Sequence, residues 1–246
     1  MPDELTFDAL TSGWTIAQRR KGHRHSTDDL LTGWYAVEVQ PAAHRILDLG
    51  SGIGSVGLIA LWRSPGATLV AIEAQAISFE LLAGNIERNG LAARVQAIHG
   101  DLRDVRLAER FELVTGSPPY WDVSEGVVPA DSQKAHARFE LRGDVRDYAL
   151  AARAALGENG RFVFCFPTVQ RARAEAACSA AGLALVRSRD VIPRAGAAPL
   201  FTLFACRRAE DTGEAPVVEP PHVVRDEQGV PTPMHVAARA TLGFTR

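Results

Sequence analysis

A rigid turn with exposed hydrogen-bond acceptors is encoded by Ser117-Pro118-Pro119-Tyr120. Two consecutive prolines fix φ and remove two backbone donors, so the turn presents carbonyl oxygens beside an aromatic ring. The Ser117 oxygen and the Pro118 carbonyl suit a planar amino group such as that of adenine, because acceptors on both N–H groups favour a pyramidal nitrogen with an available lone pair. Tyr120 could stack on a flat substrate for about 1–3 kcal/mol. We therefore assign catalytic positioning to Ser117, Pro118, Pro119 and Tyr120.

A second motif is the glycine-rich segment Asp48-Leu49-Gly50-Ser51-Gly52-Ile53-Gly54, which ends one apolar run and opens another. Glycines let the backbone turn tightly and let a ligand approach it closely. Glu73 ends the next apolar run about 20 residues on, where an acid hydrogen-bonds ribose hydroxyls. Two ligands compete: a dinucleotide, because Gly52, Gly54 and Gly57 also satisfy G-x-G-x-x-G, and S-adenosylmethionine. Asp48 favours the second ligand, which carries an ammonium and a sulfonium.

This pattern, with Glu73 after the second strand and Asp101 after the third, resembles the Rossmann-like class I methyltransferases. The diproline turn resembles the (Asn/Asp/Ser)-Pro-Pro-(Tyr/Phe/Trp) motif of amino-methyltransferases, which act on adenine N6, cytosine N4 or a glutamine amide. Ser117 stands where the tRNA- and glutamine-directed members usually have Asn. The resemblance implies S-adenosylmethionine as the cofactor, with Glu73 on its ribose and Asp101 facing its adenine amino group. The expected cofactor-binding residues are Asp48, Gly50, Ser51, Gly52, Gly54, Glu73, Asp101 and Asp28.

Two further segments resemble a narrower group, the bacterial tRNA adenine-N6-methyltransferases that modify valine tRNA. Residues 18–31, QRRKGHRHSTDDLL, resemble their segment upstream of the glycine loop, with His23 and His25 in place of aromatic rings. Residues 137–140, Ala-Arg-Phe-Glu, resemble their Ala-Arg-His-Glu segment. The whole resemblance runs over roughly residues 14–207 and implies RNA, in particular tRNA, as the partner.

The basic run at residues 19–25 could contact phosphates as a local positive patch. Arg24 could instead turn inward to pair with an acid near the cofactor site, and Asp28 could cap the following helix or help to bind the cofactor. Trp121 is either a wall of the substrate pocket or loop packing. No further His or Cys cluster completes a metal site with His23 and His25, so we expect no metal. The expected substrate-binding residues are Arg19, Arg20, Lys21, Arg24, Trp121 and Arg138.

The composition excludes several classes of protein. The chain has 246 residues, 46% hydrophobic and 23% charged, and a net charge of −2, so any nucleic acid must be bound by a local patch. Apolar runs such as residues 200–206 fall short of the roughly 20 residues that span a bilayer, and the first residues lack a signal-peptide pattern. Three cysteines without metal-like spacing fit a reducing compartment. We expect a cytoplasmic protein with no membrane partner; the oligomeric state is open, although a monomer is favoured.

The elements that must position these residues alternate between strands and helices. Apolar runs predict strands over 45–50, 68–74, 94–101, 111–120, 161–166, 184–193 and 199–208. Helical spacing and capping residues predict helices from residue 26 to 39 and over 54–63, 77–91, 145–160 and 171–183, with a weak final element over 235–244. Loops are expected over 121–143 and 209–233.

This alternation predicts an α/β fold: a Rossmann-like, mostly parallel seven-stranded sheet with an antiparallel edge strand and helices on both faces. Residues 1–40 are expected to form an N-terminal extension, polar up to residue 25, with a lead helix. Residues 41–246 are expected to form one methyltransferase domain. The resemblance implies an S-adenosylmethionine-dependent N-methyltransferase of a planar amino group, first of all adenine N6 in tRNA. The alternatives are a protein glutamine amide or a small molecule as acceptor, an NAD(P)-binding oxidoreductase, and a non-catalytic binding module.

Overall fold

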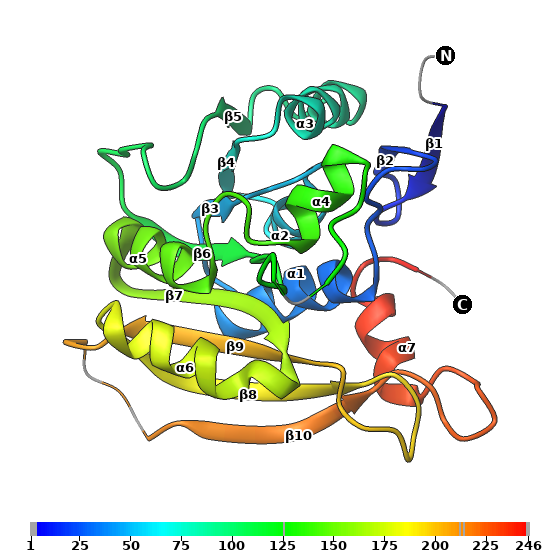
Figure 1. The fold of residues 1–246 in the computed structure, drawn as a ribbon, viewed down its shortest axis with the longest axis vertical. Coiled ribbons are helices and arrows are strands. Elements are labelled where there is room, and N and C mark those ends of the chain that lie inside the picture. Colours follow the sequence, from blue (N-terminus) through cyan, green and yellow to red (C-terminus); the bar gives the residue numbers. More distant parts are fainter. Residues whose placement is uncertain (1–3, 125, 212, 214, 245–246) are drawn as a thin grey trace.

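The computed structural model describes residues 4–124, 126–211, 213 and 215–244. A single large sheet crosses the molecule, and Figure 1 shows its strands from β5 at the top to β10 at the bottom. In spatial order the strands are β10 (Val217–Val223), β8 (Leu183–Ile192), β9 (Phe201–Arg208), β7 (Leu156–Pro167), β6 (Phe111–Gly116), β3 (Arg45–Leu49), β4 (Thr68–Glu73) and β5 (Val95–His99).

Neighbouring strands of this sheet run parallel except at β9, which is antiparallel to both β7 and β8. The predicted α/β class, with a mostly parallel sheet and helices on both faces, is confirmed. Two details of the prediction are wrong. The antiparallel strand lies inside the sheet instead of at its edge, because β9 inserts between β7 and β8, and an eighth strand, β10, forms that edge.

The edge strand β10 lies in the segment 209–233, which was expected to be a loop because of its prolines and charges. Proline has no N–H to donate to a neighbouring strand, so within sheets it is confined to edges and bulges. Pro220 and Pro221 lie where the register of β10 against β8 shifts, between Glu219 and His222. The residues that indicated a loop therefore also fit an irregular edge strand.

Alternate strand residues pack on opposite faces of the sheet, since side chains in a strand alternate in direction. Ile46 and Leu69 join one hydrophobic cluster, while their neighbours Leu47 and Val70 join the other. The first face is covered by α1 (Thr27–Val39), α2 (Ser55–Arg63), α3 (Ala76–Arg88) and α7 (Pro233–Ala240). The second face is covered by α5 (Val145–Ala155) and α6 (Arg171–Ala180), with a short 3-10 turn, η1 (Thr168–Gln170), between β7 and α6.

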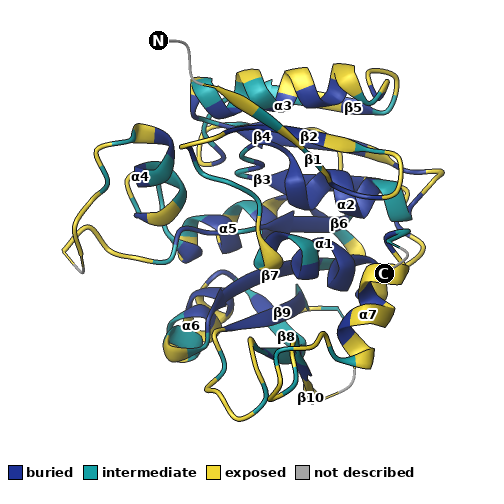
Figure 2. Cartoon of the chain, turned by 90° about the vertical axis from the view of Figure 1, so that its right-hand side faces the viewer, coloured by how far each residue is buried: buried dark blue, intermediate teal, exposed yellow. Residues whose placement is uncertain are grey.

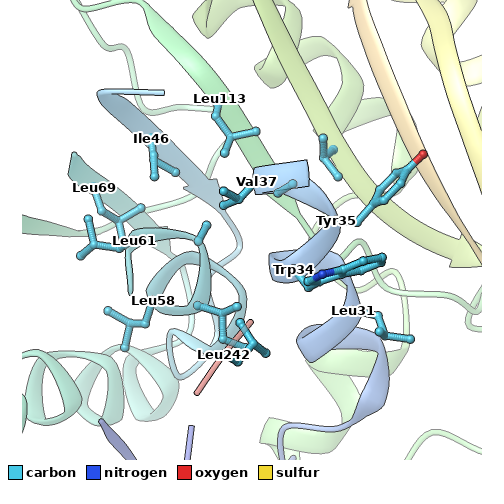
Figure 3. Packing of buried hydrophobic residues seen from close by; sticks show 14 of the residues in the cluster. Leu31, Trp34, Tyr35, Val37, Ile46, Leu58, Leu61, Leu69, Leu113 and Leu242 are labelled. Carbon is cyan, nitrogen blue, oxygen red and sulfur yellow. The ribbon is translucent and has the colours of Figure 1, made fainter. Parts of the chain in front are cut away.

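The two hydrophobic clusters hold the central strands between the two layers of helices. Figure 2 shows the central strands buried on both faces and the outer surfaces of α3 and α7 exposed. Figure 3 shows part of the first cluster, in which side chains from two helices gather against the sheet: Trp34, Tyr35 and Val37 of α1, Leu58 and Leu61 of α2, and Ile46, Leu69 and Leu113 of the strands. None of the helices in the described ranges is long and apolar enough to cross a bilayer.

A hairpin of β1 (Leu5–Ala9) and β2 (Thr15–Arg19) precedes α1, where the sequence indicated only a polar lead. Asn85 of α3 holds it: its Oδ1 accepts from the Ala17 N–H at 2.7 Å and its Nδ2 donates to the Ala17 carbonyl at 3.1 Å. The side chain of Ile16 is fully buried. The alternation of apolar and polar residues over Leu5–Ala9 fits a strand, so the sequence carried a signal for β1 that the prediction of a polar lead passed over. The division of the chain at residue 40 stays a prediction.

The segment 121–143, expected to be a loop, contains the helix α4 (Ser132–Arg138). Asp131 caps it, because its Oδ1 accepts from the Lys134 N–H at 3.0 Å. Figure 2 shows α4 outside the helix layers that cover the sheet. A helix held mainly by polar contacts lacks the apolar periodicity by which the other helices were predicted.

Candidate active site

A cavity of about 630 Å³ lies at the carboxyl ends of the central strands and is walled on one side by α4. Its volume is in the range of small-molecule sites, and this end of a parallel sheet is where ligands bind. Most of the residues selected from the sequence line it: Arg20, Arg24, Asp28, Asp48, Gly50, Ser51, Gly52, Glu73, Asp101, Ser117, Pro118, Pro119, Tyr120, Trp121 and Arg138. The other three, Arg19, Lys21 and Gly54, do not line it.

The glycine loop between β3 and α2 needs its first glycine for steric reasons. Gly50 has a φ of +60°, and a Cβ there would collide with the Tyr148 hydroxyl. Gly54 is needed for helix packing, because a Cβ on it would lie 2.8 Å from Leu82 Cδ1 of α3. Gly54 therefore allows α2 to pack against α3 and does not border the cavity, unlike Gly50 and Gly52.

Glu73 fixes the shape of this loop from the end of β4. Its two carboxyl oxygens accept from the Gly52 N–H at 2.8 Å and from the Gln75 N–H at 2.7 Å. The side chain is buried, and this burial raises the pKa of Glu73. Each oxygen keeps a further lone pair, so the carboxylate can also accept from ligand hydroxyls.

Two more acids are buried beside the loop. Asp48 accepts from the Thr115 hydroxyl at 2.7 Å and from the Gly57 N–H at 3.2 Å, and burial raises its pKa. Asp29 of α1 is buried too, and burial together with the nearby Asp28 raises its pKa well above the ordinary value.

The three buried acids Asp29, Asp48 and Glu73 form no ion pair with any residue that the structure describes. Burying carboxylates without a cation is costly. A positively charged ligand in the cavity would offset this cost, so these three carboxyl groups suit a cationic ligand.

Asp101, after β5, differs because it already has a partner. Arg103 Nε and Nη2 donate to its two oxygens at 2.9 Å and 2.7 Å, and this guanidinium lowers the pKa of Asp101. Asp101 still lines the cavity on the same side as Glu73.

The diproline turn after β6 forms the opposite wall. The Tyr120 hydroxyl donates to Asp28 Oδ2 at 3.0 Å, and its ring meets Phe166 edge-on with centroids 5.9 Å apart. Gln170 Nε2 donates to the Tyr120 carbonyl at 2.8 Å. These contacts hold the ring in one orientation, and they link Asp28 to the turn.

Residues 137–140 pair with this turn through the backbone. The N–H groups of Tyr120 and Trp121 both donate to the Arg138 carbonyl, at 3.1 Å and 3.0 Å, and the Glu140 N–H donates to the Trp121 carbonyl at 3.0 Å. Two segments selected separately from the sequence thus form one wall of the cavity. Trp121 is 40% exposed at the rim, so it is not packed in a loop interior.

The basic N-terminal run is engaged mainly within the protein, which corrects the expectation that it forms a free positive patch. Arg19 is buried and pairs with Asp131 at 3.0 Å. Arg20 pairs with Glu4 at 2.8 Å. Arg24 pairs with Asp8 of the hairpin at 2.9 Å, and because Asp8 does not line the cavity, the expected inward pairing with an acid near the cofactor site is wrong. Lys21 is exposed but lies outside the cavity lining.

Gln133 of α4 is the main site residue that the sequence did not indicate. Its Oε1 accepts from Arg19 Nη1 and from the His23 N–H, both at 3.2 Å, and its Nε2 donates to the Ser78 hydroxyl at 3.3 Å. These contacts fasten α4 to the N-terminal run and to α3. Two other lining residues, Tyr148 and Arg142, were also missed, because only tertiary contacts bring them to the cavity.

No group of three or more His, Cys, Asp or Glu side chains able to hold a metal ion occurs in the described part of the chain. His23 and His25 line the cavity, and burial lowers the pKa of both imidazoles.

Known proteins resemble this chain in sequence and in fold. The family described as the methyltransferase small domain matches residues 29–143. A tRNA1(Val) (adenine(37)-N6)-methyltransferase of Bacteroides thetaiotaomicron is 29% identical over 188 residues, covering 76% of this chain and 77% of that protein. A protein of the same name from a Flavobacteriaceae bacterium is 27% identical over 186 residues, covering 76% and 78%. A structure from Agrobacterium tumefaciens, described as a predicted O-methyltransferase, superposes with a TM-score of 0.65 at 18% identity, covering 88% of this chain and 97% of that one.

The sheet order, the acid-lined glycine loop and these similarities support one class of protein, the class I S-adenosylmethionine-dependent methyltransferases. Within that class it resembles the tRNA1(Val) (adenine(37)-N6)-methyltransferases.

Proposed function

We propose that this methyltransferase binds S-adenosylmethionine in the cavity and methylates the N6 amino group of an adenine in tRNA. The observation that carries the proposal is that one cavity joins the acid-lined glycine loop to the diproline turn. The relatives at 27% and 29% identity, whose names specify an adenine of tRNA, support the choice of substrate.

The acidic half of the cavity would hold the cofactor, which when bound supplies an electrophilic methyl group on a sulfonium. Glu73 would accept from ribose hydroxyls with the lone pairs that the Gly52 and Gln75 N–H groups leave free. Asp48 and Asp28 would face the positive charges of the ligand, and Asp101 would accept from its adenine amino group. Gly50, Ser51 and Gly52 would form the close backbone surface beneath it.

The diproline half would hold the acceptor amine. The Pro118 carbonyl and the Ser117 oxygen accept its two N–H bonds, which turns the nitrogen lone pair toward the opposite wall. Pro119 keeps the turn rigid, and the ring of Tyr120, fixed by Asp28 and Phe166, faces the base. The new ammonium is acidic, so no strong base has to be part of the site.

RNA would approach along the rim formed by α4 and Trp121. Lys134 and Arg138 line the cavity from α4, and neither forms an ion pair with a residue in the described ranges. Cationic side chains next to an exposed aromatic ring suit phosphates and unstacked bases. Of the basic run, Arg20 and Arg24 also line the cavity, each with one acidic partner. A tRNA substrate also implies that the protein works in the cytoplasm.

The proposal is tested by methyl transfer from labelled S-adenosylmethionine into RNA, DNA and protein from cells that lack the gene, followed by nuclease and protease digestion. We expect label that ribonuclease releases as N6-methyladenosine, and its loss in Ser117→Ala and Tyr120→Ala. Ser179→Ala, an exposed serine on α6, is the matched control. Label in protein would identify a glutamine amide instead, and bound cofactor without label would point to a small molecule.

A further inference from the structure

A row of four polar side chains lies behind the diproline turn. The Ser117 hydroxyl is 3.5 Å from the Cys165 sulfur, the Cys165 sulfur is 3.3 Å from the Tyr120 hydroxyl, and that hydroxyl is 3.0 Å from Asp28 Oδ2. Cys165 is fully buried on β7 and has no part in the cofactor or substrate contacts described above.

The direction of these hydrogen bonds follows from the chemistry of the last group. A carboxylate can only accept, so Tyr120 must donate its proton to Asp28. The Thr32 hydroxyl, which also reaches Cys165, donates its own proton to the Asp28 carbonyl at 2.7 Å. The thiol proton can go to the oxygen of Tyr120, Thr32 or Ser117. Tyr120 lies closer to the sulfur than Ser117 does, at 3.3 Å against 3.5 Å, and its own proton is engaged by Asp28, so we take the thiol to donate to Tyr120, which leaves only sulfur lone pairs facing Ser117.

The thiol and the phenol in the row keep their protons at neutral pH, which the directed arrangement requires. Burial raises the pKa of the Cys165 thiol to about 12, and burial also raises the pKa of the Tyr120 hydroxyl well above its ordinary value. The thiol and the phenol are thus both donors, and with the thiol proton on the Tyr120 side Ser117 can donate to the sulfur.

We propose that Cys165 and Asp28 are positioning residues that draw the Ser117 proton away from the cavity and so make the Ser117 oxygen an acceptor for a substrate N–H. The inference rests on the proposed function and explains how serine can stand where the related motifs usually have asparagine. The carboxamide oxygen of asparagine is always an acceptor, whereas a hydroxyl must be oriented. A site with two enforced acceptors selects an amino group, with two N–H bonds, over a hydroxyl or carbonyl.

A double-mutant cycle separates this role from simple packing. We expect Cys165→Ala to lower kcat for tRNA about tenfold, with the Kd for S-adenosylmethionine unchanged, and Cys165→Ser to lose less because a hydroxyl can relay the same bonds. In a Ser117→Asn background, Cys165→Ala should lower kcat less than twofold, since the carboxamide oxygen of asparagine is an acceptor whatever its neighbours do. Cys206→Ala, an equally buried cysteine on β9, controls for the loss of side-chain volume. An equal loss in both backgrounds would overturn the proposal.

A second measurement needs no activity. The infrared S–H stretching band of Cys165, isolated as the difference from the spectrum of Cys165→Ala, should show a donating thiol in the wild type and stay nearly unchanged in Ser117→Ala. A shift to the frequency of a free thiol in Ser117→Ala would mean that the thiol donates to Ser117, and the proposal would be wrong. A wild type that methylates no acceptor would refute the proposed function, while the infrared result would still decide the direction of the bonds.

Discussion

Arg19 of the N-terminal hairpin and Asp131, the cap of α4, form a 3.0 Å ion pair across 112 residues of sequence. The same carboxylate accepts from the Lys134 N–H, so one side chain both starts α4 and receives the guanidinium. Gln133 adds a hydrogen bond from Arg19 Nη1. The N-terminal run thus fastens α4 beside the cavity, where α4 presents Lys134 and Arg138.

Loss of this anchor should loosen α4. We expect Arg19→Gln to lower the free energy of unfolding by about 1–2 kcal/mol, because Asp131 loses its partner while largely shielded from solvent. Urea unfolding gives the stability, and limited proteolysis in the segment 121–143 reports on α4 directly. Arg20→Gln is the matched control, since its pair with Glu4 is more than half exposed and should contribute under about 1 kcal/mol. Equal proteolysis of both variants would argue against the anchor.

Gly50 should tolerate no side chain. Its φ is +60° and a Cβ would collide with the Tyr148 hydroxyl, so Gly50→Ala should weaken cofactor binding at least tenfold and cost about 1–3 kcal/mol of stability. Tyr148→Phe in the same chain should restore part of the binding by removing the closest atom. Gly66→Ala, where nothing lies within 4 Å of the added Cβ, should leave binding unchanged. Calorimetric titration with S-adenosylmethionine measures all three variants.

Cofactor affinity should depend on pH through the buried acids. Burial raises the pKa values of Asp48 and Glu73, so both remain protonated in the folded protein to a higher pH than in the unfolded chain. A cationic ligand favours the ionised acids, and affinity should therefore rise with pH from about 4 until both are ionised. The free energy of unfolding of the ligand-free protein should change in the opposite direction. The stability that these two acids contribute is lost as pH rises through their raised pKa values.

Calorimetry between about pH 5 and about pH 7, in buffers of different ionisation enthalpy, measures this affinity and the protons released on binding. Asp48→Asn should weaken binding about tenfold and flatten its pH dependence. Glu80→Gln, an exposed acid on α3, should change neither quantity. Binding by the wild type that is independent of pH, with no proton release, would contradict the electrostatic account.

A histidine pair should make the protein less stable in acid. His222 Nε2 and His235 Nδ1 are 3.1 Å apart, and His222 is fully buried against Trp34, with centroids 5.5 Å apart. Burial lowers the pKa of His222 to about 4, so the stability it contributes is present above pH 6.5 and is lost as pH falls through about 4. The loss should reach about 3 kcal/mol by chemical unfolding across that window. This loss of stability on acidification should be smaller in the variant His222→Leu. It should be unchanged in His44→Gln, because His44 is exposed.

The sequence by itself determined the chemistry at the ends of the central strands. Asp48, Glu73, Asp101 and Ser117 each follow an apolar run and precede a turn or helix, and parallel strands bring such positions to one end of a sheet. That inference needs only local periodicity and turn residues. Together with the basic run and the family resemblance, it selected eighteen residues, of which fifteen line one cavity.

Only the tertiary structure decided what those residues touch. Arg19 carries the same charge as Lys134, but the first meets Asp131 in the interior and the second lines the cavity, and no local pattern distinguishes them. In the sequence Cys165 is one residue of an apolar run, and its contact with Ser117 arises because β7 lies next to β6. The order of β8, β9 and β10 was likewise undetermined. Local sequence fixes the conformation of a segment, whereas partners far apart in the chain are selected by packing the whole sheet.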